Sequence, residues 1–88
     1  MIYRIEIDDK AKKQLAKIDA SQRRLISKWI DKNLVGCSDP KQFGKPLTGN
    51  LKGFWRYRVG SYRLLVKIHD DIVTVIIVDI DHRSNIYN

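Results

Sequence analysis

The chain is short, strongly basic and moderately hydrophobic, and these properties bound both its fold and its partners. Its 88 residues predict a single small domain spanning 1–88, with 43% hydrophobic residues and a formal net charge of +7. The single Cys37 excludes an intramolecular disulfide and an all-cysteine metal site. No apolar run reaches the roughly 20 residues that span a bilayer, and no signal-peptide pattern is visible, so we expect a cytoplasmic protein. The charge leaves nucleic acid, an anionic membrane surface or an acidic protein as partner.

The first half of the chain predicts one strand and two helices. Residues 1–7 alternate isoleucine imperfectly with polar residues, which is typical of a strand. Asp8 and Asp9 then supply an N-cap, and an apolar residue recurs at helical spacing in Ala11, Leu15 and Ile18. A second helix with Ser21 as its expected N-cap has the apolar stripe Leu25, Ile26, Trp29, Ile30 and Leu34. Residues 35–53 hold both prolines and most of the glycines, so we expect a long loop.

Residues 54–68 predict a β-hairpin that turns at Gly60-Ser61. This turn fixes the cross-strand pairs Val59–Tyr62, Arg58–Arg63, Arg56–Leu65 and Phe54–Lys67. Side chains alternate between the faces of a strand, so the face away from the core carries Arg56, Arg58, Arg63 and Lys67. Like charges directly opposite each other are destabilising, and a polyanionic ligand is the natural reason for such a cluster. A solvated sheet face is the alternative.

The last strand is expected at Ile72–Asp81, after a tight turn centred on Asp70-Asp71. In a ladder without a β-bulge, the pairs would be Lys67–Thr74, Leu65–Ile76 and Arg63–Val78. Continued parity places Ile80 and His82 on the arginine face, and Val73, Val75 and Ile77 on the core face. The arginine face then also carries an apolar strip that needs cover, formed by Leu65, Ile76, Val78 and Ile80.

These elements predict an α+β fold of the order β-α-α-β-β-β. A helical hairpin packs on one face of a four-stranded, largely antiparallel sheet. The cationic residues lie on the opposite face.

The chemistry available on that face suits cleavage of RNA. The sequence shows no Ser/His/Asp set, phosphate-binding glycine loop or carboxylate pair, and two histidines without suitable neighbours argue against a metal site. Arginines can bind a phosphate and stabilise a dianionic transition state during metal-free attack of a 2′-hydroxyl. His82 can transfer a proton near neutral pH, although a surface histidine is the alternative. The lysines expected to bind RNA are Lys41, Lys45, Lys52 and Lys67.

Three segments closely resemble the RelE/ParE superfamily of toxin–antitoxin toxins. They are residues 46–58 (PLTGNLKGFWRYR), 61–64 (SYRL) and 82–87 (HRSNIY). The resemblance to the RelE branch implies a RelE-like microfold and a cofactor-free endoribonuclease that cleaves mRNA in the ribosomal A site, leaving a cyclic phosphate. It also implies contact with the ribosome and its rRNA, and a cognate antitoxin that neutralises the toxin. Operator DNA would be bound only by the toxin–antitoxin complex.

The resemblance assigns roles to individual residues. Arg56 and Arg58 match two catalytic basic positions, and Arg63 matches a phosphate-binding arginine. The closing segment matches an arginine that stabilises the transition state or leaving group (Arg83), a tyrosine that stacks on mRNA (Tyr87) and a histidine implicated in catalysis (His82). The best-known pattern has lysines in place of Arg56 and Arg58, and arginine, with a pKa above about 12, is a poor general base. His82 is therefore the expected base.

Two other functions fit the same sequence. A ParE-type toxin would block DNA gyrase by binding, without nuclease chemistry. A basic RNA-binding module would bind through the same cations and catalyse nothing.

Overall fold

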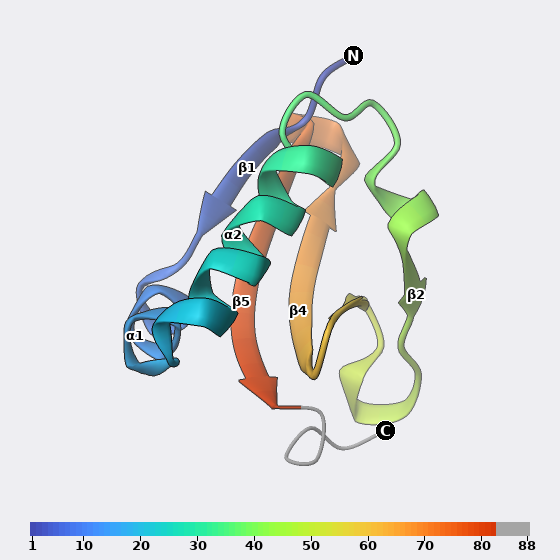
Figure 1. Cartoon of the computed structure of the whole chain (residues 1–88). Coiled ribbons are helices and arrows are strands. Elements are labelled where there is room, and N and C mark those ends of the chain that lie inside the picture. Colours follow the sequence, from blue (N-terminus) through green and yellow to red (C-terminus); the bar gives the residue numbers. More distant parts are fainter. Residues whose placement is uncertain (83–88) are drawn as a thin grey trace.

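A computed structural model of the chain describes residues 1–82 and shows two helices on a mixed five-stranded sheet (Figure 1). In chain order the main elements are β1 (Arg4–Ile7), α1 (Asp9–Lys17), α2 (Ala20–Asn33), β2 (Gly44–Pro46), β3 (Phe54–Val59), β4 (Tyr62–His69) and β5 (Thr74–His82). The strand order in the sheet is β1-β5-β4-β3-β2. β1 pairs with β5 in parallel, and the other neighbours are antiparallel. The α+β class and the helical hairpin are confirmed.

The expected strand count was one too low. Within the segment expected to be a loop, a 3-10 helix, η1 (Pro40–Phe43), leads into β2, which pairs with residues 55–57 of β3. A second 3-10 helix, η2 (Gly49–Leu51), follows β2. The three residues of β2 are too few to show the alternating pattern that predicts a strand. Pairing with β3 stabilises this short strand instead.

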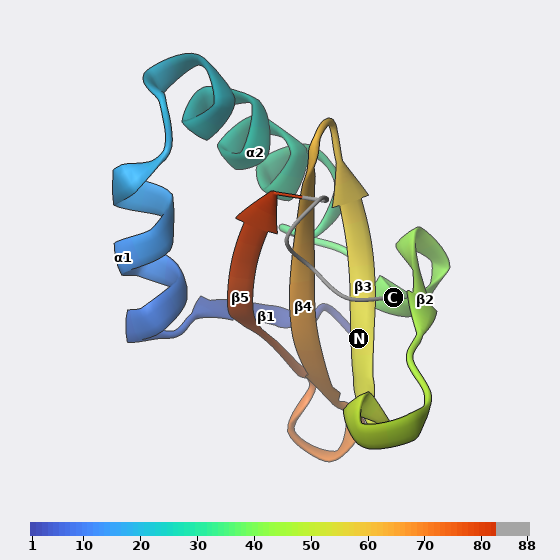
Figure 2. The same ribbon diagram turned by 90° about the horizontal axis from the view of Figure 1, so that it is seen from below.

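The core lies between the helices and one face of the sheet (Figures 1 and 2). α1 packs beside β5, and α2 reaches towards β3. Ile26, Leu34, Tyr57, Leu64 and Ile77 are fully buried there. The Tyr57 hydroxyl donates a hydrogen bond to Pro40 O at 2.7 Å, which ties η1 to the core. None of the helices within residues 1–82 is long and apolar enough to cross a membrane.

The helix starts follow the sequence at α1 and differ at α2. The Asp8 carboxylate accepts a hydrogen bond from Ala11 N at 2.9 Å, as expected for an N-cap. Ser21 lies inside α2, so the prediction that it is the N-cap was wrong. Asp19 occupies that position, and the Ser21 hydroxyl donates to Asp19 Oδ2 at 2.7 Å. This bond, rather than a bond to the helix backbone, uses the serine hydroxyl.

The β3–β4 hairpin has the predicted register throughout. All four expected pairs, including Arg58–Arg63 and Phe54–Lys67, are present. Gly60 has a φ of 58°, and a Cβ there would lie 2.9 Å from Leu25 Cδ2 on α2. Both the backbone conformation and this close approach favour glycine at the turn.

The β4–β5 register differs from the prediction for two reasons. Residues 70–72 form a 3-10 turn, and Val73 follows with a φ of 49°, so it belongs to the turn and not to the core face. A register shift between Leu65 and Val66 then moves the outer half of β5 by one further residue. The pairs are His69–Thr74, Lys67–Ile76, Leu65–Asp79, Arg63–Asp81 and Tyr62–His82.

The bulge inverts the faces of the end of β5. Ile80 pairs with Leu64 and is 2% exposed within the core, so its predicted place on the arginine face was wrong. His82 pairs with Tyr62 and follows the same parity. Val75 and Ile77, which precede the bulge, lie in the core as predicted.

The end of β5 has a side chain where a neighbouring strand would be. β1 pairs with β5 only from Thr74 to Ile77. Beyond that point, Gln14 of α1 accepts a hydrogen bond from Ile80 N at 2.8 Å through Oε1 and donates to Asp79 Oδ1 at 2.5 Å through Nε2. The helix therefore closes part of the edge that β1 leaves uncovered.

Candidate nucleic-acid interface

The sheet face opposite the helices gathers five basic residues from β2, β3 and β4. We call it the cationic face; it comprises Lys45, Arg56, Arg58, Arg63 and Lys67. Lys45 lies directly opposite Arg56, and Arg58 lies directly opposite Arg63. Directly opposed residues have Cβ atoms about 4.5–5.5 Å apart. The pairing of the strands therefore places these positive charges side by side. Such a row of cations suits the binding of a polyanion.

The three arginines differ in exposure. Arg58 is exposed and Arg56 is partly buried, whereas Arg63 retains only 4% of its exposed surface. Arg63 therefore lies on the predicted face of the sheet, but its side chain is buried rather than exposed. A guanidinium stays charged when buried, and its orientation is then fixed by its surroundings. Arg63 is the preorganised member of the set.

The bulge brings a carboxylate to the cationic face that the sequence reading missed. Asp81 lies opposite Arg63, where Val78 was expected. His82 N donates to Asp81 Oδ1 at 2.8 Å. The alternation Asp79-Ile80-Asp81 is the signal that could have revealed it, because both carboxylates share a face once Ile80 is assigned to the core.

His82 lies on the opposite face of β5 from Asp81, and therefore on the opposite face of the sheet from Arg63. Its ring centroid is 5.5 Å from that of Tyr62, in an edge-to-face arrangement. The two rings border a hollow that Gln14 of α1 and Ile18, the C-cap of that helix, also line. The predicted placement of His82 on the arginine face was wrong, because the bulge changed its side. Its catalytic role stays a prediction.

The predicted RNA-binding lysines separate into two groups. Lys45 and Lys67 belong to the cationic face, where Lys67 Nζ lies 5.3 Å from the Phe54 ring centroid. Lys52 is exposed at the end of η2, just before β3. Lys41 instead pairs with Asp70 at 2.8 Å, by the turn between β4 and β5.

The Lys41–Asp70 pair belongs to a surface clamp. The Tyr3 hydroxyl donates to the other carboxylate oxygen of Asp70 at 2.7 Å. The hydrogen bonds from Lys41, and then from Tyr3, lower the pKa of Asp70. The clamp joins the N-terminal segment, η1 and the β4–β5 turn, so a structural role accounts for Lys41.

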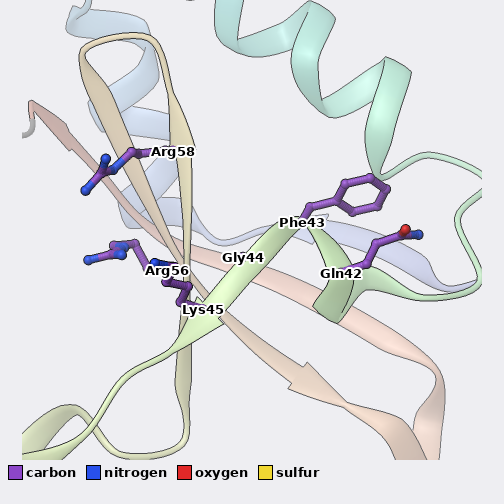
Figure 3. A pocket seen from close by; sticks show the side chains of 6 residues that line it. All are labelled: Gln42, Phe43, Gly44, Lys45, Arg56 and Arg58. Carbon is purple, nitrogen blue, oxygen red and sulfur yellow. The ribbon is translucent and has the colours of Figure 1, made fainter.

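A pocket of about 280 Å³ opens beside the cationic face, where β2 begins. Its lining comprises Gln42, Phe43, Gly44, Lys45, Arg56 and Arg58 (Figure 3). Arg56 and Arg58 extend to the same side of β3, and Gln42 and Phe43 come from the end of η1 (Figure 3). This pocket could not be predicted from the sequence, because residues 35–53 were expected to form a loop without β2.

Two predicted site residues, Arg83 and Tyr87, lie outside the described residues. Across residues 1–82, no group of three or more His, Cys, Asp and Glu side chains is arranged to hold a metal ion.

Comparison with known proteins identifies the family. The family model described as the ParE toxin of type II toxin–antitoxin systems, parDE, matches residues 5–87. Toxin RelG of Mycobacterium tuberculosis is 34% identical over 88 residues, covering 99% of this chain and 98% of RelG. A chain of the M. tuberculosis toxin–antitoxin complex RelBE2 superposes with a TM-score of 0.82 at 30% identity, covering 94% of this chain and all of that one.

More distant structures share the fold. The archaeal RelE–RelB complex from Pyrococcus horikoshii contains a chain with a TM-score of 0.70 at 21% identity, covering 98% of this chain and 100% of that chain. The chain belongs to the RelE/ParE superfamily and is a toxin of a type II toxin–antitoxin system.

Proposed function

We propose that this toxin is a cytoplasmic endoribonuclease that cleaves mRNA in the A site of the ribosome and so inhibits translation. The observation that carries the proposal is the pair Arg58–Arg63, directly opposed on the cationic face, with Arg56 two residues before Arg58 on the same face. Placing two like charges opposite each other costs folding free energy. Binding of a phosphodiester, which accepts hydrogen bonds from both guanidinium groups, would explain why they are there. The identity of 34% with Toxin RelG supports the RelE branch.

The reaction is an internal transfer at phosphorus. The RNA 2′-oxygen attacks the adjacent phosphorus and loses its proton to a base. The bond from phosphorus to the 5′-oxygen breaks, and that oxygen gains a proton from an acid, leaving a 2′,3′-cyclic phosphate and a 5′-hydroxyl. Arg63 and Arg58 stabilise the negative charge that grows on the non-bridging oxygens. Arg56 and Lys45 hold the neighbouring backbone, and we assign Arg83 to the leaving group and Tyr87 to stacking on a base.

The proton acceptor is assigned by comparing two variants. His82→Ala should flatten the pH dependence of single-turnover cleavage near neutral pH if His82 is the base. Asp81 lies opposite Arg63 and provides the competing carboxylate. If His82→Ala retains the wild-type profile while Asp81→Asn loses the acidic limb, Asp81 takes the role. If neither variant changes the profile, both are excluded as the base.

The proposed partners are a cognate antitoxin, the ribosome with its mRNA and rRNA, and operator DNA bound by the toxin–antitoxin complex. The solved RelBE2 structure of M. tuberculosis is a toxin–antitoxin complex, which supports the first of these. The apolar strip on the cationic face comprises Leu65, Ile76 and Val78 without Ile80, because the bulge moved Ile80 to the core. We propose that an acidic amphipathic segment of the antitoxin covers this strip, with Lys67 at its border.

The decisive experiment compares purified toxin on programmed ribosomes with the same mRNA in free solution, with cleavage mapped by primer extension. We expect cleavage on the ribosome and little without it, because the site relies on the ribosome to align the 2′-hydroxyl. Efficient cleavage of free RNA would refute the ribosome dependence. Intact mRNA in both reactions would refute the nuclease.

The second candidate is a ParE-type toxin that inhibits DNA gyrase by binding. The matching family model carries the ParE description, and this favours the candidate. A supercoiling assay run beside the cleavage assay separates the two: inhibited supercoiling with intact mRNA selects the ParE-type function.

A further inference from the structure

We propose that Asp81 is a positioning residue whose carboxylate, on β5, holds the buried guanidinium of Arg63 towards the reacting phosphate. The catalytic meaning of this role rests on the proposed nuclease function. The contact between the two side chains does not, so it can be tested without any cleavage.

The strand register places Arg63 between a like charge and an opposite charge. β3, β4 and β5 lie side by side (Figure 2), and Arg63 pairs with Arg58 on one side and with Asp81 on the other. Directly opposed residues have Cβ atoms about 4.5–5.5 Å apart, so both charges lie within reach of one guanidinium. The register shift in β4 creates this arrangement, since the register before the shift, continued along β4, would put Ile80 opposite Arg63.

An opposed carboxylate offsets the cost of burying Arg63. This arginine is 4% exposed, and taking a guanidinium out of water is costly unless an opposite charge and hydrogen bonds compensate. The neighbouring Arg58 raises that cost, because like charges directly opposite each other are destabilising. Asp81 is partly buried and supplies the opposite charge at a position where solvent screens it less than at the surface.

The Asp81 carboxylate is itself held in place. Its Oδ1 accepts a hydrogen bond from His82 N at 2.8 Å. A carboxylate has two oxygens with about four acceptor sites, so this bond leaves room to accept another from a guanidinium. A guanidinium is a rigid planar fork, so fixing one of its N–H groups fixes the direction of the others. The carboxylate can therefore set the direction in which Arg63 donates to a phosphate.

The other carboxylate on this part of β5 has a different role. Asp79 lies two residues before Asp81 on the same face, opposite Leu65. Its carboxylate accepts a hydrogen bond from Gln14 Nε2 at 2.5 Å and lies 3.5 Å from Lys10 Nζ, so contacts with α1 account for it. Asp79 is therefore the matched control for removing a carboxylate from this strand.

The first test measures single-turnover cleavage on programmed ribosomes as a function of toxin concentration. Removing the carboxylate has two opposite effects, because the phosphate is repelled less and Arg63 is held less well. For Asp81→Asn we expect a maximal rate about tenfold lower, which is part of the loss of about 10²–10³-fold expected for the arginine itself. The half-saturating concentration should not rise, because the variant loses a negative charge beside the phosphate.

Two further variants complete this test. Asp81→Glu, which restores the charge, should regain most of the rate, and Asp79→Asn should cleave normally. An undiminished maximal rate in Asp81→Asn, a higher half-saturating concentration or an equal loss in Asp79→Asn would each overturn the proposal.

A double-mutant cycle tests whether Asp81 acts through Arg63. In the Arg63→Ala background, Asp81→Asn should slow cleavage no further, because the side chain that it positions is gone. Losses that multiply would show that Asp81 acts independently of Arg63, as a proton acceptor would, and would refute the positioning role. Asparagine has nearly the same shape as aspartate, and urea denaturation of each variant measures its folded fraction.

The second test needs no cleavage and follows the Arg63 side chain by NMR of the full-length toxin labelled with ¹⁵N-arginine. The Nε–H signal of Arg63 is assigned by its loss in Arg63→Ala. We expect this signal to move and broaden in Asp81→Asn, because a charge-assisted hydrogen bond to the guanidinium is lost, and to stay unchanged in Asp79→Asn. An unchanged Arg63 signal in Asp81→Asn would exclude the contact.

The outcome is separable from that of the proposed nuclease. If ribosomes show no cleavage but the Arg63 signal depends on Asp81, the contact stands and the nuclease fails. If the wild-type toxin cleaves mRNA and Asp81→Asn changes neither the Arg63 signal nor the rate, the nuclease stands and the positioning role fails.

Discussion

The two faces of the sheet are built from the same strands yet obey opposite physical demands. The helix-covered face buries Tyr57, Leu64 and Ile77 completely, and every one of these side chains adds to the stability of the fold. The cationic face opposes Arg58 to Arg63 and Lys45 to Arg56, which lowers stability. The difference shows that successive residues of one strand can have separate roles. One side chain stabilises the core, and the next, on the other face, is available to bind a ligand.

Removing core volume should give the largest effect and should act on folding. Ile26→Ala, at a fully buried position of α2, is expected to lower the free energy of unfolding by about 2–5 kcal/mol, since it leaves a cavity. Urea denaturation measures the loss. Ile72→Ala is the matched control, because Ile72 is 62% exposed and should cost far less. Equal losses in both variants would contradict the assigned core.

Removing the central arginine should act on catalysis. Arg63→Ala is expected to slow single-turnover cleavage about 10²–10³-fold, roughly 3–4 kcal/mol, because a preorganised charge stabiliser is lost. Arg63 is 4% exposed, so the folded fraction must be measured by urea denaturation beside the rate. Arg24→Ala, on the exposed part of α2, is the control and should cleave normally. A folded Arg63→Ala variant with the wild-type rate would remove Arg63 from the site.

A smaller effect is expected from the buried hydroxyl on the helix-covered face. Tyr57→Phe loses the hydrogen bond to Pro40 O and should cost about 0.5–1.5 kcal/mol. Burial raises the pKa of Tyr57 above its ordinary value near 10. Because the folded pKa is the higher one, this contribution is complete below about pH 10 and is lost as the pH rises further. Tyr57→Phe should therefore lose less stability between neutral and strongly alkaline pH than the wild type, and an equal alkaline loss would contradict the assignment.

The smallest effect should have the opposite sign. Arg58→Gln removes one of two opposed charges and should raise the free energy of unfolding by about 0.2–1 kcal/mol while slowing cleavage. The gain should shrink at high salt, because screening already weakens the repulsion in the wild type. Urea denaturation at two salt concentrations checks both points, with the exposed Arg24→Gln as control. A loss of stability would show that Arg58 supports the fold.

The sequence predicted the β3–β4 hairpin because its turn is short and glycine-led. A two-residue turn at Gly60 and Ser61 allows only one register of the two strands. The pairing of Arg58 with Arg63 could therefore be predicted directly. The β4–β5 ladder could not be predicted in the same way. Val73 adopts a positive φ, which a β-branched residue rarely does, and nothing in the sequence marks the bulge at Leu65–Val66. A shift of one residue reverses every side chain beyond it, which moved His82 and Ile80 away from the arginines and brought Asp81 to them.

The burial of Arg63 and the pocket at η1 were also beyond sequence reasoning. Both depend on neighbours that are distant along the chain, such as the approach of Gly44 to Tyr57. The residues that carry charge could be recognised from the sequence, whereas their exposure required the packed sheet.

The amide of Gln14 has a consequence for behaviour at high concentration. A bare strand edge offers backbone donors and acceptors to any other extended chain, and such pairing is a route to aggregation. β1 leaves the end of β5 uncovered, and Gln14 occupies Ile80 N while its own amide nitrogen bonds Asp79. One side chain of α1 thus makes the hydrogen bond that an invading strand would seek, and Lys10 adds a charge 3.5 Å from the Asp79 carboxylate. The hydrogen bond from Ile80 N to Gln14 and the charge of Lys10 thus disfavour pairing of this edge with a strand of another molecule.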